Sequence, residues 1–117
     1  MLTVMGAGLG FAGVALGAFG AHGLEGRVSA EGIGWWNTAS QYLLLHAVAA
    51  LACGLSGRGG LMGAGGWAMA LGAVVFAGTL YAMALGAPRW LGAVTPLGGL
   101  GMLAGWAMVG AGALRTL

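Results

Sequence analysis

The sequence predicts an all-α integral membrane protein: a four-helix up-down bundle with a short interfacial segment before its fourth helix. Charge is sparse, since 4 arginines and 2 glutamates are the only charged side chains among 117 residues. They leave four uncharged runs, at residues 1–24, 32–57, 59–88 and 90–114. About 20 mostly apolar residues cross a bilayer, so each run suffices for one crossing. A soluble domain carries roughly 25% charged residues, against 5% here, and we therefore expect a single transmembrane domain over residues 1–117.

The first helix is expected over residues 2–21. Small residues recur along it at the spacing of one helix face: Gly6, Gly10, Gly13, Gly17 and Ala21. In lipid, burial of leucine drives little association, whereas small residues let two helix backbones approach and pack closely. We therefore expect this face to contact a neighbouring helix.

The second helix is expected over residues 37–55. A loop at 23–34 precedes it, and that loop carries half of the charged side chains. Trp35 and Trp36 lie between the loop and the helix, where indole rings suit the membrane interface.

Polar residues on this second helix form its most informative pattern. Thr38, Tyr42 and His46 follow one another at intervals of four, so they share one face, with Gln41 beside them. His46 is expected about 15 Å into the helix, near the middle of the bilayer. An ionisable group at that depth usually faces other helices and has a partner. His46 is therefore either part of a proton-relay, ligand or ion site, or a neutral histidine bonded to a neighbouring helix.

The third helix is expected over residues 61–85, ending before Pro88, because proline disfavours helix at the residue that precedes it. The fourth is expected over residues 96–114. Thr95 would cap it and Pro96 would take the first helical position. Residues 90–94 would then lie at the interface. The alternative is one helix that starts at Trp90 and kinks at Pro96.

Short connections make successive helices antiparallel neighbours, so the first and third loops share one end of the bundle. Most of the polar residues fall at or toward that end. A ligand site or polar cluster is therefore expected among His22, Gln41, Tyr42, His46, Tyr81, Arg89 and Thr95. The structural alternative is that Arg89 pairs with Glu25 or Glu31 and holds two loops together.

Several classes of function find no support in the residues. No basic run suggests nucleic acid, and the two histidines lie at different depths without a cysteine–histidine set for a metal. No aspartate and no nucleophile motif occur, so we expect neither an enzyme nor a cofactor. The single cysteine, Cys53, is expected to be a packing residue.

Orientation depends on the arginines, which favour the cytoplasmic side. Arg58 and Arg115 are expected at the end that carries both chain termini, and Arg27 and Arg89 at the other. The terminal amine then favours cytoplasmic termini.

Several motifs read together suggest a family. They are GAFGAHGL (17–24), TASQYLLLHAVAAL (38–51), FAGTLYAMAL (76–85) and RWLGAVTPLGG (89–99), followed by Gly105 and Trp106. In order and spacing they resemble the YgdD-like small membrane proteins, domain of unknown function 423, with transmembrane protein 256 as an animal relative. The resemblance covers nearly the whole chain. It implies an inner-membrane or mitochondrial protein of about four helices, and it implies no activity.

Two functions are therefore expected. The first is a module that binds a lipid or another hydrophobic ligand, or that serves as an accessory subunit of a larger membrane complex. The second is a small oligomeric transporter or permeation unit with a polar path at His46 and Tyr42. The expected partners are membrane lipids and a second copy of the chain or a larger complex.

Overall fold

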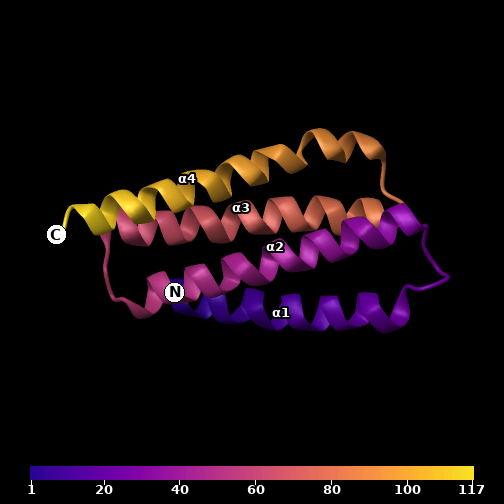
Figure 1. Cartoon of the computed structure of the whole chain (residues 1–117), viewed down its shortest axis with the longest axis horizontal. Coiled ribbons are helices and arrows are strands. Elements are labelled where there is room, and N and C mark those ends of the chain that lie inside the picture. Colours follow the sequence, from indigo (N-terminus) through magenta and orange to yellow (C-terminus); the bar gives the residue numbers. More distant parts are fainter.

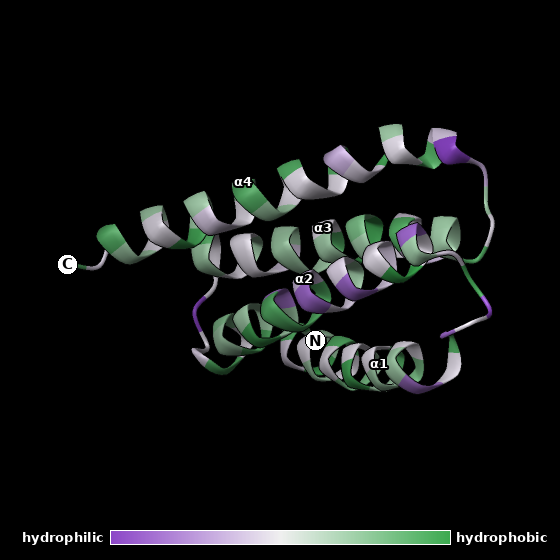
Figure 2. Cartoon of the chain, turned by 45° about the vertical axis from the view of Figure 1, so that its right-hand side comes forward, coloured by the Kyte–Doolittle hydropathy of each residue, from purple (hydrophilic) through white to green (hydrophobic).

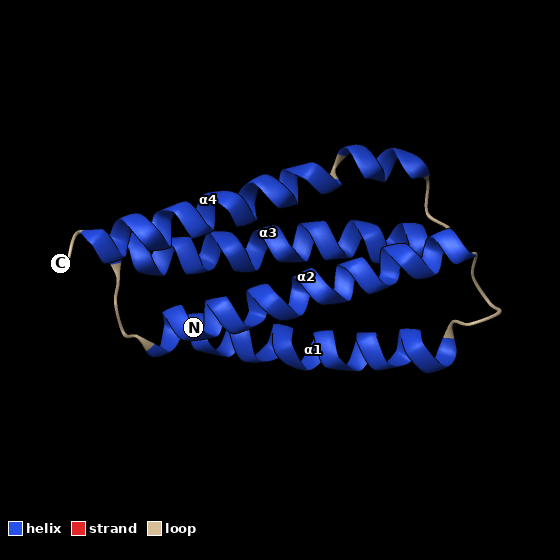
Figure 3. Cartoon of the chain, in the orientation of Figure 1, coloured by secondary structure: helices blue, strands red, loops and turns tan.

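A computed structural model describes residues 1–117 and contains helices and loops but no strands (Figures 1 and 3). The chain has four long helices, and each runs antiparallel to its neighbours in the chain (Figure 1). Their bounds are Leu2–Gly23 for α1, Ala30–Leu55 for α2, Gly60–Ala84 for α3 and Thr95–Leu114 for α4. A short 3-10 helix, η1 (Arg89–Ala93), precedes α4. The predicted all-α class, with an extra segment before the last helix, is confirmed.

All four helices are long and apolar enough to cross a membrane. Figure 2 shows hydrophobic or near-neutral colours along most of their length, with hydrophilic bands on α2 and near the loops. The bundle measures 51 × 26 × 19 Å. Its long axis therefore exceeds the ~30 Å hydrocarbon core of a bilayer, which leaves the loops at the two interfaces.

The helices pack in chain order. Each of α1, α2 and α3 has an extensive contact with the helix that follows it, whereas α1 makes no extensive contact with α4. The bundle is therefore open between its first and last helices, and α2 and α3 form its centre. We call the end with the α1–α2 and α3–α4 connections the loop end, and the other the terminal end (Figure 1).

Glycine faces join the outer helices to the centre. On α1 the small-residue face packs on α2, as predicted, with Gly20 continuing it in place of the exposed Ala21. On α3 and α4 the two backbones touch. A Cβ built on Gly98 would lie 2.6 Å from the carbonyl oxygen of Gly72, and one built on Gly72 would lie 2.7 Å from that of Gly98. Such close approach supplies dispersion contacts between the helices. These contacts matter because the hydrophobic effect does not drive helix association within lipid.

Helix α2 begins at residue 30, so the predicted start at 37 is wrong. Ser29 caps the helix, since its hydroxyl accepts a 3.0 Å hydrogen bond from the backbone N–H of Gly32. Glu31 adds a favourable negative charge to the first turn. The predicted loop is correspondingly shorter, and Trp35 and Trp36 lie inside the helix.

The start of α4 also differs from its prediction. Thr95 is the first helical residue and does not cap the helix, because Val94 takes the capping position without a side-chain hydrogen bond. The Thr95 hydroxyl instead bonds backward to the carbonyl of Leu91 at 3.2 Å. Pro96 lies in the first turn, as expected. Three other helix ends shift slightly, since α1 continues to Gly23 and α3 runs from Gly60 to Ala84.

Candidate functional site

His46 lies in the middle of α2 and has both ring nitrogens engaged. Its Nδ1 is 2.7 Å from the carbonyl oxygen of Tyr42, and its Nε2 accepts a 2.9 Å hydrogen bond from Nε1 of Trp106. An indole N–H only donates and a carbonyl only accepts. The histidine is therefore neutral, with its proton on Nδ1. This arrangement agrees with the structural interpretation of His46, a histidine bonded to a neighbouring helix.

The bond to Trp106 joins two helices that otherwise make little contact, since α4 packs on α3 and α2 packs on α1 and α3. The surrounding rings hold the pair in place. Tyr42 stacks on the imidazole with ring centroids 6.1 Å apart, and Phe76 of α3 lies 4.9 Å from the Tyr42 ring. His46 is only 6% exposed. The pair therefore links α2 to α4 across α3.

A groove runs between α2 and α4 on both sides of the His46–Trp106 bond. The hollow toward the terminal end has a volume of about 740 Å³, and the one toward the loop end about 550 Å³. Both are lined by His46 and Trp106. We call the two hollows together the α2–α4 groove. Volumes of this size are typical of small-molecule sites.

The lining of the groove is mainly apolar, and in the smaller hollow 6 of the 9 lining residues are hydrophobic. In the larger hollow, 10 of the 11 lining residues are hydrophobic, and His46 is the exception. Because both His46 nitrogens already have partners, no free polar atom of this residue faces the hollow. The groove can therefore hold a hydrocarbon chain by shape and dispersion.

A second buried polar contact joins α2 to α3 nearer the loop end. The hydroxyls of Ser40 and Tyr81 are 2.7 Å apart. The indole of Trp36 packs edge-on against the Tyr81 ring, with centroids 4.4 Å apart. Its Nε1 donates to the carbonyl oxygen of Leu16 at 2.6 Å, which brings α1 into the same contact. This part of the candidate site holds three helices together.

We expect Tyr81→Phe to lower the free energy of unfolding by about 1 kcal/mol, because it removes the hydroxyl partner of Ser40 in a buried position. Denaturant titration in mixed micelles, followed by circular dichroism, measures the loss. The double variant Ser40→Ala with Tyr81→Phe removes both hydroxyls and should lose little more than Tyr81→Phe alone. If the stability lost by the double variant equalled the sum of the losses of Tyr81→Phe alone and Ser40→Ala alone, a direct bond between the two residues would be contradicted.

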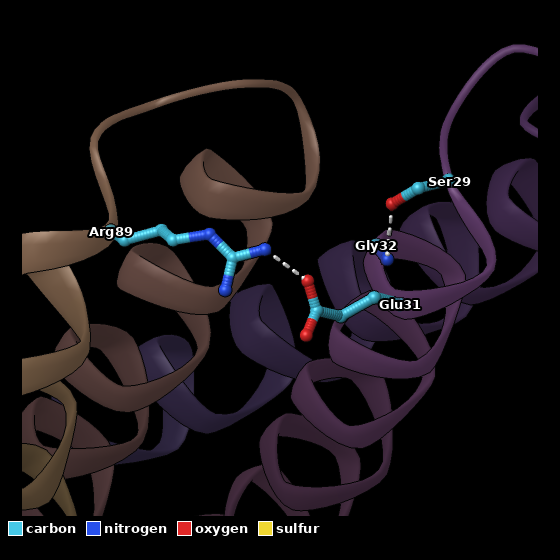
Figure 4. Close-up of polar contacts among 4 residues, drawn as sticks. All are labelled: Ser29, Glu31, Gly32 and Arg89. Carbon is cyan, nitrogen blue, oxygen red and sulfur yellow. Dashed lines mark hydrogen bonds and ion pairs between the residues drawn. The ribbon is translucent and has the colours of Figure 1, made fainter.

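An ion pair closes the loop end. Arg89 of η1 pairs with Glu31 in the first turn of α2, close to the Ser29 cap (Figure 4). The guanidinium also lies 5.4 Å from the ring centroid of Trp35. The pairing expected for Arg89 is therefore present with Glu31 as the partner, but it joins η1 to the start of α2 instead of two loops. Both side chains are more than half exposed, so the pair positions the loops more than it stabilises the fold.

The seven predicted site residues do not form one cluster. Tyr42 and His46 lie together at the groove, whereas Tyr81 and Arg89 belong to the two contacts described above. Thr95 pairs with Thr79, their hydroxyls 2.6 Å apart. His22 and Gln41 are exposed and make no side-chain hydrogen bond within the chain. No group of three potential metal ligands occurs.

Sequence reasoning missed three contributors to the site: Ser40, Trp36 and Trp106. Ser40 lies four residues after Trp36 on the same helix, a spacing that was available in the sequence. Trp106 could not be matched to His46, because 60 residues separate them and the rotation of α4 about its axis was unknown.

The chain is similar to known membrane proteins along most of its length. Residues 16–99 match the family described as "Protein of unknown function (DUF423)". The UPF0382 membrane protein YwdK of Bacillus subtilis (strain 168) is 42% identical over 122 residues, which cover 100% of this chain and 98% of the relative. No solved structure matches the chain.

Two further relatives have similar extents. The UPF0382 membrane protein SH2409 of Staphylococcus haemolyticus (strain JCSC1435) is 40% identical, with 93% of this chain and 91% of the relative covered. The UPF0382 inner membrane protein YgdD of Escherichia coli (strain K12) is 41% identical, with 91% and 83% covered. The similarity therefore extends over all four helices.

Proposed function

This chain belongs to the DUF423 family of membrane proteins, as its motifs predicted, and we propose that it binds a hydrophobic chain of a membrane lipid in the α2–α4 groove. It is a small polytopic membrane protein, and the proposal adds a ligand to that description. The observation that carries it is the apolar groove of two hollows, divided by the bond between His46 and Trp106.

The surroundings of the groove favour a lipid chain as its occupant. Its walls and floor belong to helices that are apolar enough to lie within the bilayer. Exposed apolar side chains border it on both walls, among them Leu45 and Val48 on α2 and Leu103 on α4. A groove bordered in this way opens toward hydrocarbon, so an acyl or isoprenoid chain can enter sideways without crossing a polar region.

The polar contacts argue against the alternative of a transporter with a path through His46 and Tyr42. Such a path needs polar groups in series that can exchange partners. Here the imidazole is held between a carbonyl and an indole N–H, and most of the residues that line the space on both sides are apolar. The inner membrane of a bacterial cell is the location we propose, from the printed name of the Escherichia coli relative.

Filling the larger hollow tests the proposal. Ala52 lines it and is itself exposed, so Ala52→Phe should occupy the hollow without disturbing the packed interior. We expect the purified variant to retain about tenfold less added dioleoyl phosphatidylcholine than the unmodified protein, a loss of about 1.4 kcal/mol in binding. Native mass spectrometry from a mild detergent counts the retained lipid.

Ala18→Phe is the matched control, because Ala18 is also an exposed alanine in a spanning helix but lies on α1, away from the groove. It should retain as much lipid as the unmodified protein. Equal retention by the two variants, or an unmodified protein that holds no lipid, would overturn the proposal.

A further inference from the structure

The two ends of the bundle differ in charge. Both acidic side chains, Glu25 and Glu31, lie at the loop end, where they balance Arg27 and Arg89. The terminal end carries the other two arginines and no acidic side chain. Its arginine side chains therefore have no carboxylate side chain to pair with, which leaves them available to an anion from outside the chain.

The two arginines of the terminal end, Arg58 and Arg115, line one small hollow. It has a volume of about 350 Å³ and lies between the α2–α3 loop and the end of α4. One guanidinium nitrogen of Arg58 donates a 3.2 Å hydrogen bond to the hydroxyl of Thr116, which turns that side chain toward α4. Three glycines, Gly59, Gly60 and Gly112, are among the remaining lining residues and add no side chains to the hollow.

The geometry of the α2–α3 loop is what presents Arg58 there. Gly57 and Gly60 flank it closely and have φ angles of +69° and +59°. Such angles are readily adopted only by glycine, so the tight loop needs these residues. The arginine is thereby held beside the first turn of α3 instead of extending away from the bundle.

The small hollow and the larger hollow of the α2–α4 groove are neighbours, since Met62 lines both. The distances suit a lipid. His46 precedes the end of α2 at Leu55 by nine residues, or about 14 Å at 1.5 Å per residue. Half of a hydrocarbon core of about 30 Å is about 15 Å. A lipid with its head at the arginines would therefore reach the His46–Trp106 bond with its chain.

We infer that Arg58 and Arg115 bind the phosphate-containing headgroup of an anionic phospholipid whose chain lies in the α2–α4 groove. This inference rests on the proposed function and names the lipid class and the leaflet, that of the terminal end. Guanidinium groups bind phosphate oxygens through paired N–H donors, which makes arginine suited to the task. A zwitterionic headgroup carries a positive charge beside its phosphate, so the two arginines bind it less tightly.

The test compares two lipids with identical chains. We expect the unmodified protein, in mild detergent, to retain about tenfold more dioleoyl phosphatidylglycerol than dioleoyl phosphatidylcholine, measured by native mass spectrometry. In the double variant Arg58→Gln with Arg115→Gln this preference should vanish, because retention of phosphatidylglycerol falls to the level of phosphatidylcholine. The variant must unfold at the same denaturant concentration as the unmodified protein.

Arg27→Gln is the control, because it removes an exposed arginine from the loop end and should leave the preference intact. The inference fails if the double variant keeps the preference, if the unmodified protein has none, or if inorganic phosphate at millimolar concentration displaces the lipid, which would indicate a site for soluble anions. Equal retention of both lipids overturns only the headgroup site. Retention of neither overturns the proposed function as well.

Discussion

Gly98→Ala should lower the free energy of unfolding by about 3 kcal/mol, although it adds a single methyl group. The new Cβ would lie 2.5 Å from the backbone nitrogen of Phe76 and 2.6 Å from the carbonyl oxygen of Gly72. Both are backbone atoms of a continuous helix, so neither can turn aside as a flexible side chain would. Helices α3 and α4 would have to separate along their contact, with loss of dispersion over several turns.

The neighbouring glycine provides the control. A Cβ on Gly99 would meet nothing within 4 Å, so Gly99→Ala should leave stability unchanged or raise it slightly, because alanine favours helix over glycine. Both variants are compared by denaturant titration in mixed micelles, with circular dichroism as the signal. Equal stabilities for the two would show that α3 and α4 do not make this backbone contact.

The four spanning helices could be predicted because charge is so costly in hydrocarbon that six side chains mark the limits of the crossings. The same reasoning failed at the start of α2. Glu31 was expected inside the loop at 23–34, whereas it lies in the first turn of α2. The local signal was the serine at position 29, whose hydroxyl caps the helix, and it carries no charge.

Packing was predictable in part. The glycines of α1 were expected to face a neighbour because of their regular spacing, and they do face α2. The openness of the bundle could not be predicted in this way, because the spacing of small residues shows which face is close-packed and not which helices remain apart. The groove arises from that openness, since α2 and α4 both rest on α3 and touch each other through few side chains.

In the candidate site, too, contacts within one helix could be predicted and contacts between helices could not. Tyr42 and His46 were expected on one face and they stack on each other, since helix periodicity within one segment is reliable. Partners from other helices depend on how each helix is rotated about its axis. For this reason Trp106 was not foreseen as the donor to His46, and His22 was grouped with residues from which the structure separates it.

Trp36 should be the most costly side chain to remove. It is 3% exposed, and it contacts α1 through the carbonyl of Leu16 and α3 through the ring of Tyr81. The approach to α1 is possible because position 20 is glycine, where a Cβ would lie 2.5 Å from the indole nitrogen. A cavity at this point would weaken the contacts of three helices at once.

We therefore expect Trp36→Ala to lower the free energy of unfolding by about 4 kcal/mol, and Trp36→Phe, which keeps a ring but loses the N–H donor, by about 1 kcal/mol. Trp90→Ala serves as the matched control, because Trp90 is 66% exposed on η1, and its loss should remain within about 0.5 kcal/mol. Titration in mixed micelles measures all three. If Trp36→Ala and Trp90→Ala lost the same amount, Trp36 would not be the residue that joins α1 to α3. The ranking expected here follows from one physical difference: the indole at position 36 is surrounded by three helices, whereas the indole at position 90 is largely exposed.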